Sequence, residues 1–238
     1  MFTRILAMGV LAGALAGFFA AAVQAVLVQP LIERAERLEL AAPGAPGHEA
    51  HEAHESESHS HRAVEEPPED ATQRRLATLA AVVSTAIGYG LLMSGALALF
   101  RKQGLEQGLA IGALGFLAMQ FAPSLGAPPQ PPGSPAYDVL TRQLWWLLAA
   151  ACTASGLGLV WRAAARHRPA LAALAALLLA LPHAVQPILD GMGPQPDPAH
   201  LMDPFVLSSF ATSAVLWLSL GGIAGALHAR AARSPEHP

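Results

Sequence analysis

The chain has 238 residues, of which 53% are hydrophobic and only 13% are charged, and its mean hydropathy is +0.39. A soluble domain carries about 25% charged residues, so this composition argues against a soluble fold and favours a membrane protein. The net charge of -3 gives no reason to expect a nucleic-acid partner. Because Cys152 is the single cysteine, an intrachain disulfide and a cysteine-based zinc or iron–sulfur site are both excluded.

Six apolar segments are candidates for membrane-spanning helices, which need about 20 predominantly apolar residues. The first lies within residues 1–30 and is closed by Pro30. The others form a helical region over residues 76–230, with spans at about 76–100, 105–122, 144–161, 171–189 and 205–227, and residues 231–238 form a polar tail. We therefore predict an all-α fold, a polytopic transmembrane helical bundle of five to six spans.

Positive charge in the short loops predicts the orientation of this bundle, because cytoplasmic loops retain Lys and Arg. If the chain crosses six times, most basic residues fall on one side: Arg4, Arg101, Lys102, Arg162, Arg166, Arg168, Arg230 and Arg233. This places both termini in the cytoplasm, in the inner (plasma) membrane of a bacterium, and the polar loop 31–75 outside. Arg74 and Arg75, at the outer edge of the second span, argue mildly against it.

The first span has a second interpretation, a cleaved signal peptide, because Arg4 precedes an apolar core with small residues at its end. The apolar run continues to Val28, which is longer than such a core needs. Either interpretation leaves the loop 31–75 outside.

Glycines recur at intervals of four in three of the spans: Gly9, Gly13 and Gly17, then Gly108 and Gly112, then Gly221 and Gly225. This spacing places the glycines of each span on one helix face, where another backbone can approach closely. We expect tight packing inside the bundle or association with a partner helix.

The polar loop 31–75 contains the strongest metal-binding signal. Half of the ten histidines lie within fourteen residues: His48, His51, His54, His59 and His61. Neutral imidazole suits cobalt, nickel, copper and zinc, and the interleaved glutamates add oxygen ligands. The flanking prolines and glycines predict a loop that is disordered without metal. The alternative is a solvated spacer without metal. Because imidazole binds metal only when neutral, the affinity should fall below about pH 6.5.

Two further histidines are candidate ligands in and beside the fifth span. His183 follows Pro182, and a proline inside a helix frees a backbone carbonyl, as in the broken helices where transporters site their ligands. His200 lies in the loop 190–204 with three aspartates and no basic residue, which would attract a cation. The alternatives are that His183 satisfies a neighbouring carbonyl near the interface and that the loop is an ordinary Pro-rich connection.

The sequence contains no G-x-x-x-x-G-K-[ST] phosphate-binding loop, no paired carboxylates and no Ser-His-Asp constellation that indicates catalysis. We therefore predict that the chain is not an enzyme. If an ion is moved uphill, the energy comes from another subunit or from an ion gradient.

Six stretches carry a family resemblance, at residues 1–6, 28–33, 120–129, 132–133, 142–146 and 181–185. They resemble the CbtA family of probable cobalt transporter subunits, and the resemblance extends over nearly the whole chain. The Phe-Ala-Pro and Arg-Gln-Leu-Trp-Trp stretches are the most specific of these. The resemblance implies a histidine-bearing loop after the first span, a link to cobalamin biosynthesis and a small histidine-containing membrane partner called CbtB.

Two functional hypotheses follow. In the first, the chain is a membrane subunit for uptake of a divalent transition metal, with cobalt favoured over nickel or zinc and with capture by the outer loop. In the second, it is a metal-binding membrane accessory or sensor that delivers the ion to another permease and forms no path itself.

Overall fold

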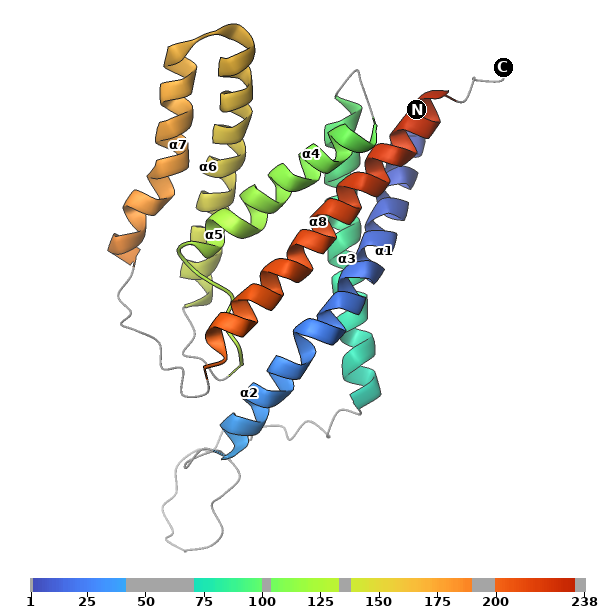
Figure 1. Cartoon of the computed structure of the whole chain (residues 1–238), viewed down its shortest axis with the longest axis vertical. Helices are drawn as coiled ribbons and strands as arrows, with labels where there is room; N and C mark the ends of the chain where they lie inside the picture. The colour runs from blue at the N-terminus through green and yellow to red at the C-terminus, as the bar shows by residue number, and fades with distance from the viewer. Residues whose placement is uncertain (1, 42–70, 100–103, 133–137, 190–199, 234–238) are drawn as a thin grey trace, which may run out of the picture.

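The computed structural model describes residues 2–41, 71–99, 104–132, 138–189 and 200–233, and the regular structure in these ranges is entirely helical (Figure 1). Within them, five helices are long and apolar enough to cross a membrane: Phe2–Leu27, Thr72–Ala98, Leu105–Ser124, Val139–Arg166 and Met202–Arg233. A sixth helix has a shorter apolar stretch, Pro169–Val185. The predicted all-α bundle with five to six spans is confirmed.

The elements follow one another as α1 (Phe2–Leu27), α2 (Gln29–Ala41), α3 (Ala71–Ala98), α4 (Leu105–Phe116), the π-helical turn η1 (Leu117–Phe121), α5 (Ala122–Ser124), α6 (Val139–Arg166), α7 (Pro169–Leu189) and α8 (Met202–Arg233). α4, η1 and α5 together form one span. The structure differs from the sequence-based expectation at residues 31–41, which belong to α2 instead of an irregular loop. The predicted disorder of the histidine segment lies outside the described residues.

The helices form two groups. α1, α3, α4 and α8 pack together, and the hairpin of α6 and α7 joins them mainly through η1 and α5 (Figure 1). The first residues of α1 and the last residues of α8 lie at one end of the bundle. The opposite end, which we call the loop end, carries α2, the start of α3 and the start of α8.

The core of the first group consists mainly of small side chains on α1 and larger ones on α3 and α8. Ala12 and Ala16 of α1 are fully buried against Leu97 of α3 and Leu220 of α8, and Trp217 packs beside them. Many large apolar side chains remain exposed on the outside of the helices. Such a surface suits contact with lipid, where burial in protein is not required for apolar residues.

The glycines at fourfold spacing lie where helices touch backbone to backbone. A Cβ atom on Gly13 of α1 would lie 2.5 Å from the carbonyl oxygen of Ala86 in α3. A Cβ atom on Gly221 of α8 would lie 3.0 Å from the Cα atom of Gly112 in α4. Neither crossing has room for a side chain, and the close approach that the spacing predicts is present inside the bundle.

Candidate functional site

The histidines predicted to bind metal fall in three separate parts of the chain. His48, His51, His54, His59 and His61 lie outside the described residues. His183 is half-buried in α7, whereas His200 is exposed just before α8, with a left-handed φ of 52°. Among the described residues, no three or more His, Cys, Asp or Glu side chains gather where they could hold a metal ion. The structure therefore does not assemble His183 and His200 into a shared ligand set.

The helix break expected at Pro182 is not present. α7 continues as one α-helix from Pro169 to Leu189, and the His183 ring meets the ring of Trp145 in α6 edge-on, with centroids 6.1 Å apart and planes at 68°. Edge-to-face aromatic packing of this kind stabilises a contact by about 0.5–1.5 kcal/mol. His183 thus packs α7 against α6.

The irregular backbone lies instead in the span formed by α4, η1 and α5. π-helical turns inside α-helices occur frequently at functional sites. Pro123 follows the turn and has no N–H, so it cannot donate to the carbonyl of Met119 four residues earlier. Nε1 of Trp146 donates to that carbonyl at 3.0 Å, and Nε1 of the buried Trp145 donates to the carbonyl of Pro123 at 2.9 Å. Two indoles of α6 therefore satisfy carbonyls at the irregular turn.

These contacts border a cavity of about 270 Å³, which we call the tryptophan cavity. It is lined by Met119, Gln120, Pro123, Ser124, Ala127, Pro128, Pro129, Gln130, Arg142, Gln143, Trp145 and Trp146. The stretches 120–129 and 142–146, far apart in sequence, form most of this wall. Gly126 leaves room for the Trp145 ring, because a Cβ there would overlap its six-membered ring. The lining offers amide groups and one guanidinium but no carboxylate or imidazole, so it is poorly suited to a bare dication.

Helix α6 begins with a side-chain cap that fixes its first turn. Oδ2 of Asp138 accepts hydrogen bonds from the backbone N–H of Thr141 at 2.9 Å and from its hydroxyl at 3.0 Å. The N–H bond from Thr141, and then its hydroxyl, hold the pKa of the Asp138 carboxyl below its ordinary value. This cap starts the helix seven residues before Trp145 and so helps to position both tryptophans.

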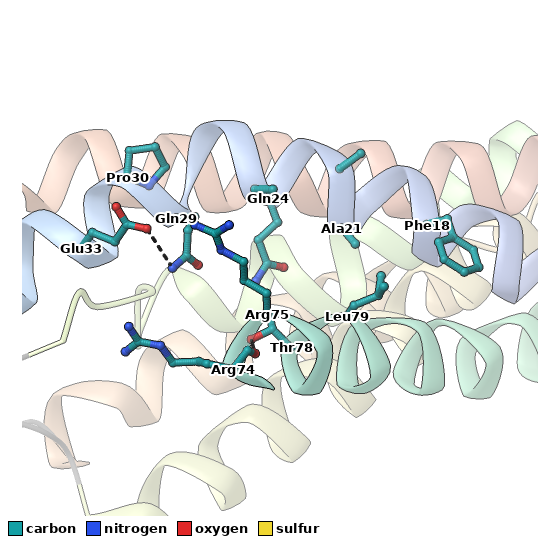
Figure 2. Close-up of a pocket in the computed structure, with 12 residues that line it drawn as sticks. Phe18, Ala21, Gln24, Gln29, Pro30, Glu33, Arg74, Arg75, Thr78 and Leu79 are labelled. Atoms are coloured by element: carbon teal, nitrogen blue, oxygen red, sulfur yellow. Dashed lines mark hydrogen bonds between the residues drawn. The ribbon is translucent and has the colours of Figure 1, made fainter. Parts of the chain in front are cut away.

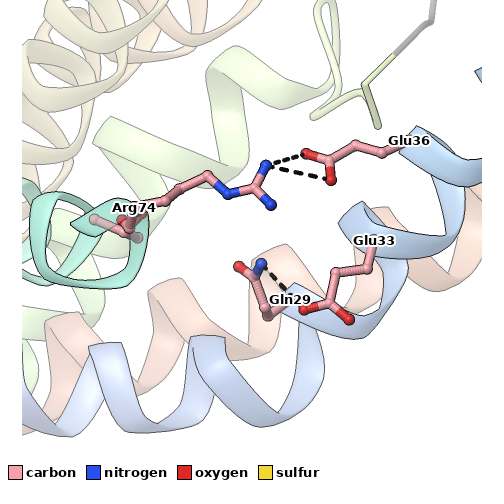
Figure 3. A network of polar contacts seen from close by, with 5 residues as sticks. Gln29, Glu33, Glu36 and Arg74 are labelled. Carbon is pink, nitrogen blue, oxygen red and sulfur yellow. Dashed lines mark hydrogen bonds and ion pairs between the residues drawn. The ribbon is translucent and has the colours of Figure 1, made fainter. Parts of the chain in front are cut away.

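At the loop end, an ion pair links α2 and α3, the helices before and after the histidine segment. Nη1 of Arg74 in α3 lies 3.3 Å from Oε1 of Glu36 in α2, and Nε2 of Gln29 donates to Oε1 of Glu33 at 3.5 Å (Figure 3). The ion pair is exposed, so its contribution is at most about 1 kcal/mol. It links the middle of α2 to the first turn of α3.

A second cavity, of about 590 Å³, lies between α1, α2 and α3 next to this ion pair (Figure 2). We call it the loop-root cavity, and it is lined by Phe18, Ala21, Ala22, Gln24, Ala25, Gln29, Pro30, Glu33, Arg74, Arg75, Thr78 and Leu79. Two guanidinium groups face one carboxylate among these residues. Coulomb repulsion between a guanidinium and a divalent cation makes the cavity an unfavourable site for a metal ion.

One buried histidine was not singled out by the sequence analysis. His228 in α8 is 3% exposed, and its Nε2 has no hydrogen-bond partner within the described part of the chain. A buried polar atom without a partner is uncommon. The sequence signal that points to it is an ionisable residue directly after the apolar segment 205–227, in a helix that continues to Arg233.

The protein-family model described as "Probable cobalt transporter subunit (CbtA)" matches residues 2–229 of the chain. Comparisons with curated proteins and with solved structures give no match.

Proposed function

The chain belongs to the CbtA family of probable cobalt transporter subunits, and from this premise we propose that it is a membrane subunit for uptake of cobalt for cobalamin biosynthesis. In this proposal the histidine loop captures the ion outside the cell. The protein lies in the bacterial inner membrane with both termini in the cytoplasm, and a small histidine-containing CbtB-like subunit completes the pathway.

The arrangement of the loop end is the observation that supports capture. The ion pair of Arg74 and Glu36 links α2 to the first turn of α3, which are the helices before and after residues 42–70. His200 and Asp203 lie at the same end, at the start of α8. In the proposal, ions captured by the five loop histidines are released at this end of the bundle.

His183 is the proposed next ligand. It lies within an apolar helix, where an ionisable residue is a functional candidate, and its half-buried ring is oriented by Trp145. Neutral imidazole is a suitable ligand for cobalt, nickel or zinc, so the ligand type alone does not select cobalt. Selection among these metals is tested by competition for uptake.

Uptake of labelled cobalt by cells that lack their own importer tests the proposal. We expect accumulation when the chain is expressed with its partner subunit, and nickel and zinc in excess should compete less well than cobalt. A metal-delivering accessory would instead raise uptake only when another permease is present. Absence of cobalt accumulation with the partner and without any other permease would contradict the proposal.

Two substitutions at one position separate a ligand role of His183 from a packing role. His183→Phe keeps an aromatic ring beside Trp145 but removes both ligand nitrogens, whereas His183→Ala removes the ring as well. We expect both variants to lose cobalt uptake and only the alanine variant to lose stability. Normal uptake by a folded phenylalanine variant would show that His183 is a packing residue.

A further inference from the structure

The loop-root cavity joins an apolar half to a cationic half. Phe18, Ala21 and Leu79 lie toward one end of it, within the apolar parts of α1 and α3 (Figure 2). Arg74, Arg75 and Glu33 lie toward the other end, close to α2 (Figure 2). The lining runs from residue 18 to residue 33, which is roughly 22 Å along a helix axis. This matches about half of the 40–45 Å thickness of a bilayer with its headgroups.

At the cationic end of the cavity, one of the two arginines is paired with a carboxylate and the other, in the part of the chain that the structure describes, is not. Arg74 pairs with Glu36 at 3.3 Å, and the carboxylate of Glu33 accepts a hydrogen bond from Gln29. Arg75 has no acidic partner among the described residues, and Figure 2 shows it extending from α3 toward α1 and the start of α2. Arg75 is therefore the cation available to a ligand, and a guanidinium presents five N–H donors that fit phosphate oxygens.

We infer that the loop-root cavity binds one anionic phospholipid, with the phosphate at Arg75 and an acyl chain along Phe18 and Leu79. A basic pocket between transmembrane helices is the arrangement that recognises anionic headgroups. The amide of Gln24, which also lines the cavity, supplies a further donor beside the phosphate. The apolar half lies within the span of α1, so it is in contact with lipid and out of reach of a soluble anion.

A bound lipid at this place would link three helices at the root of the histidine loop. α1 and α3 form the walls of the cavity, and α2 forms its loop end. α2 and α3, the helices before and after residues 42–70, would then be linked by the lipid as well as by the exposed ion pair of Arg74 and Glu36. The lipid proposal concerns binding and does not require that the chain carry cobalt.

Native mass spectrometry of the purified full chain in detergent tests the inference. Phosphatidylglycerol should bind more tightly than phosphatidylcholine, and inorganic phosphate should not displace it. Arg75→Gln should weaken phosphatidylglycerol binding roughly fivefold, the effect of one basic residue near a membrane surface. Arg75→Lys should retain most of the binding. Arg34→Gln is the matched control, because Arg34 is an exposed arginine of α2 that does not line the cavity.

A second variant tests the apolar half without changing the charge. Ala22→Phe fills the cavity where the acyl chain would lie and should abolish tight binding while leaving the protein folded. Equal binding of the two lipids, equal effects of Arg75→Gln and Arg34→Gln, or unchanged binding by the Ala22→Phe variant would each overturn the inference. Displacement by inorganic phosphate would also overturn it, because the ligand would then be a soluble anion.

Discussion

The contact between Trp146 and Met119 makes a quantitative prediction about the third span. Trp146→Phe removes the indole N–H that donates to the Met119 carbonyl at 3.0 Å. Pro123 has no N–H that could replace it, so the Met119 carbonyl loses its hydrogen bond from α6 and gains no other from residue 123. Trp146 is 37% exposed, and the ring that remains keeps most of the packing. We expect the free energy of unfolding to fall by about 1–2 kcal/mol. This value lies between the contribution of a typical hydrogen bond in a membrane protein and the cost of leaving a buried carbonyl without a partner.

The proline supplies the internal test of this explanation. In a Pro123→Ala background, residue 123 gains an N–H that can donate to the Met119 carbonyl along the helix. Trp146→Phe should then cost about 1 kcal/mol less than it does in the natural chain. The free energies of unfolding are measured by titration with a denaturing detergent in mixed micelles, and the four proteins form a double-mutant cycle.

The control for this cycle replaces a proline on another helix. Pro204→Ala in the first turn of α8 should leave the effect of Trp146→Phe unchanged, because Pro204 contributes nothing to the Met119 carbonyl. Additivity of Trp146→Phe and Pro123→Ala within about 0.3–0.5 kcal/mol would refute the reasoning. The tryptophan pair would then stabilise the span by ring packing rather than through its N–H groups.

Two further predictions concern other contacts. Gly221→Val should destabilise the bundle by about 1–3 kcal/mol, because α4 and α8 meet backbone to backbone there, and unchanged detergent unfolding would contradict that crossing. Gly88→Val, at a glycine with open space around it, is the control. Asp138→Ala should loosen the first turn of α6, whereas Asp138→Asn should retain most of the cap, as measured by hydrogen exchange at Thr141. Because the pKa of Asp138 is lowered in the folded state, the stabilisation by its carboxylate is present above the unfolded pKa and is lost as pH falls through the folded pKa. Loss of protection at Thr141 already at neutral pH would contradict this.

The sequence predicted the helical fold well, because the length and the apolarity of each span are local properties. Hydropathy located the helices, and the glycine spacing indicated where backbones approach one another. The sequence alone could not predict that α4 pairs with α8, because Gly108 and Gly221 are compatible with many partner helices. The helical state of residues 31–41 was missed although Leu31, Ala35 and Leu38 recur there at helical spacing, because the charged composition of the segment assigned it to the polar loop.

The candidate sites were harder to predict. The proline at position 182 suggested a broken helix, yet α7 continues through it, while the irregular turn occurs just before Pro123. A proline removes one hydrogen bond in either case, and packing against neighbouring helices decides whether the backbone departs from α-helical geometry. The two cavities could not be predicted from the sequence either, because each is formed by segments that meet only in the folded bundle. The role of the loop histidines stays a prediction, since they lie outside the described residues.

Cobalt uptake as a function of cobalt concentration tests the central claim most directly. Cells expressing the chain with its partner are compared with cells expressing the same chain without residues 48–61, at equal protein levels in the membrane. If the five loop histidines gather the ion, the deletion should reduce uptake at scarce cobalt and leave the maximal rate unchanged when cobalt is plentiful. An equal fractional loss at every concentration, or no loss at any, would contradict capture by the loop.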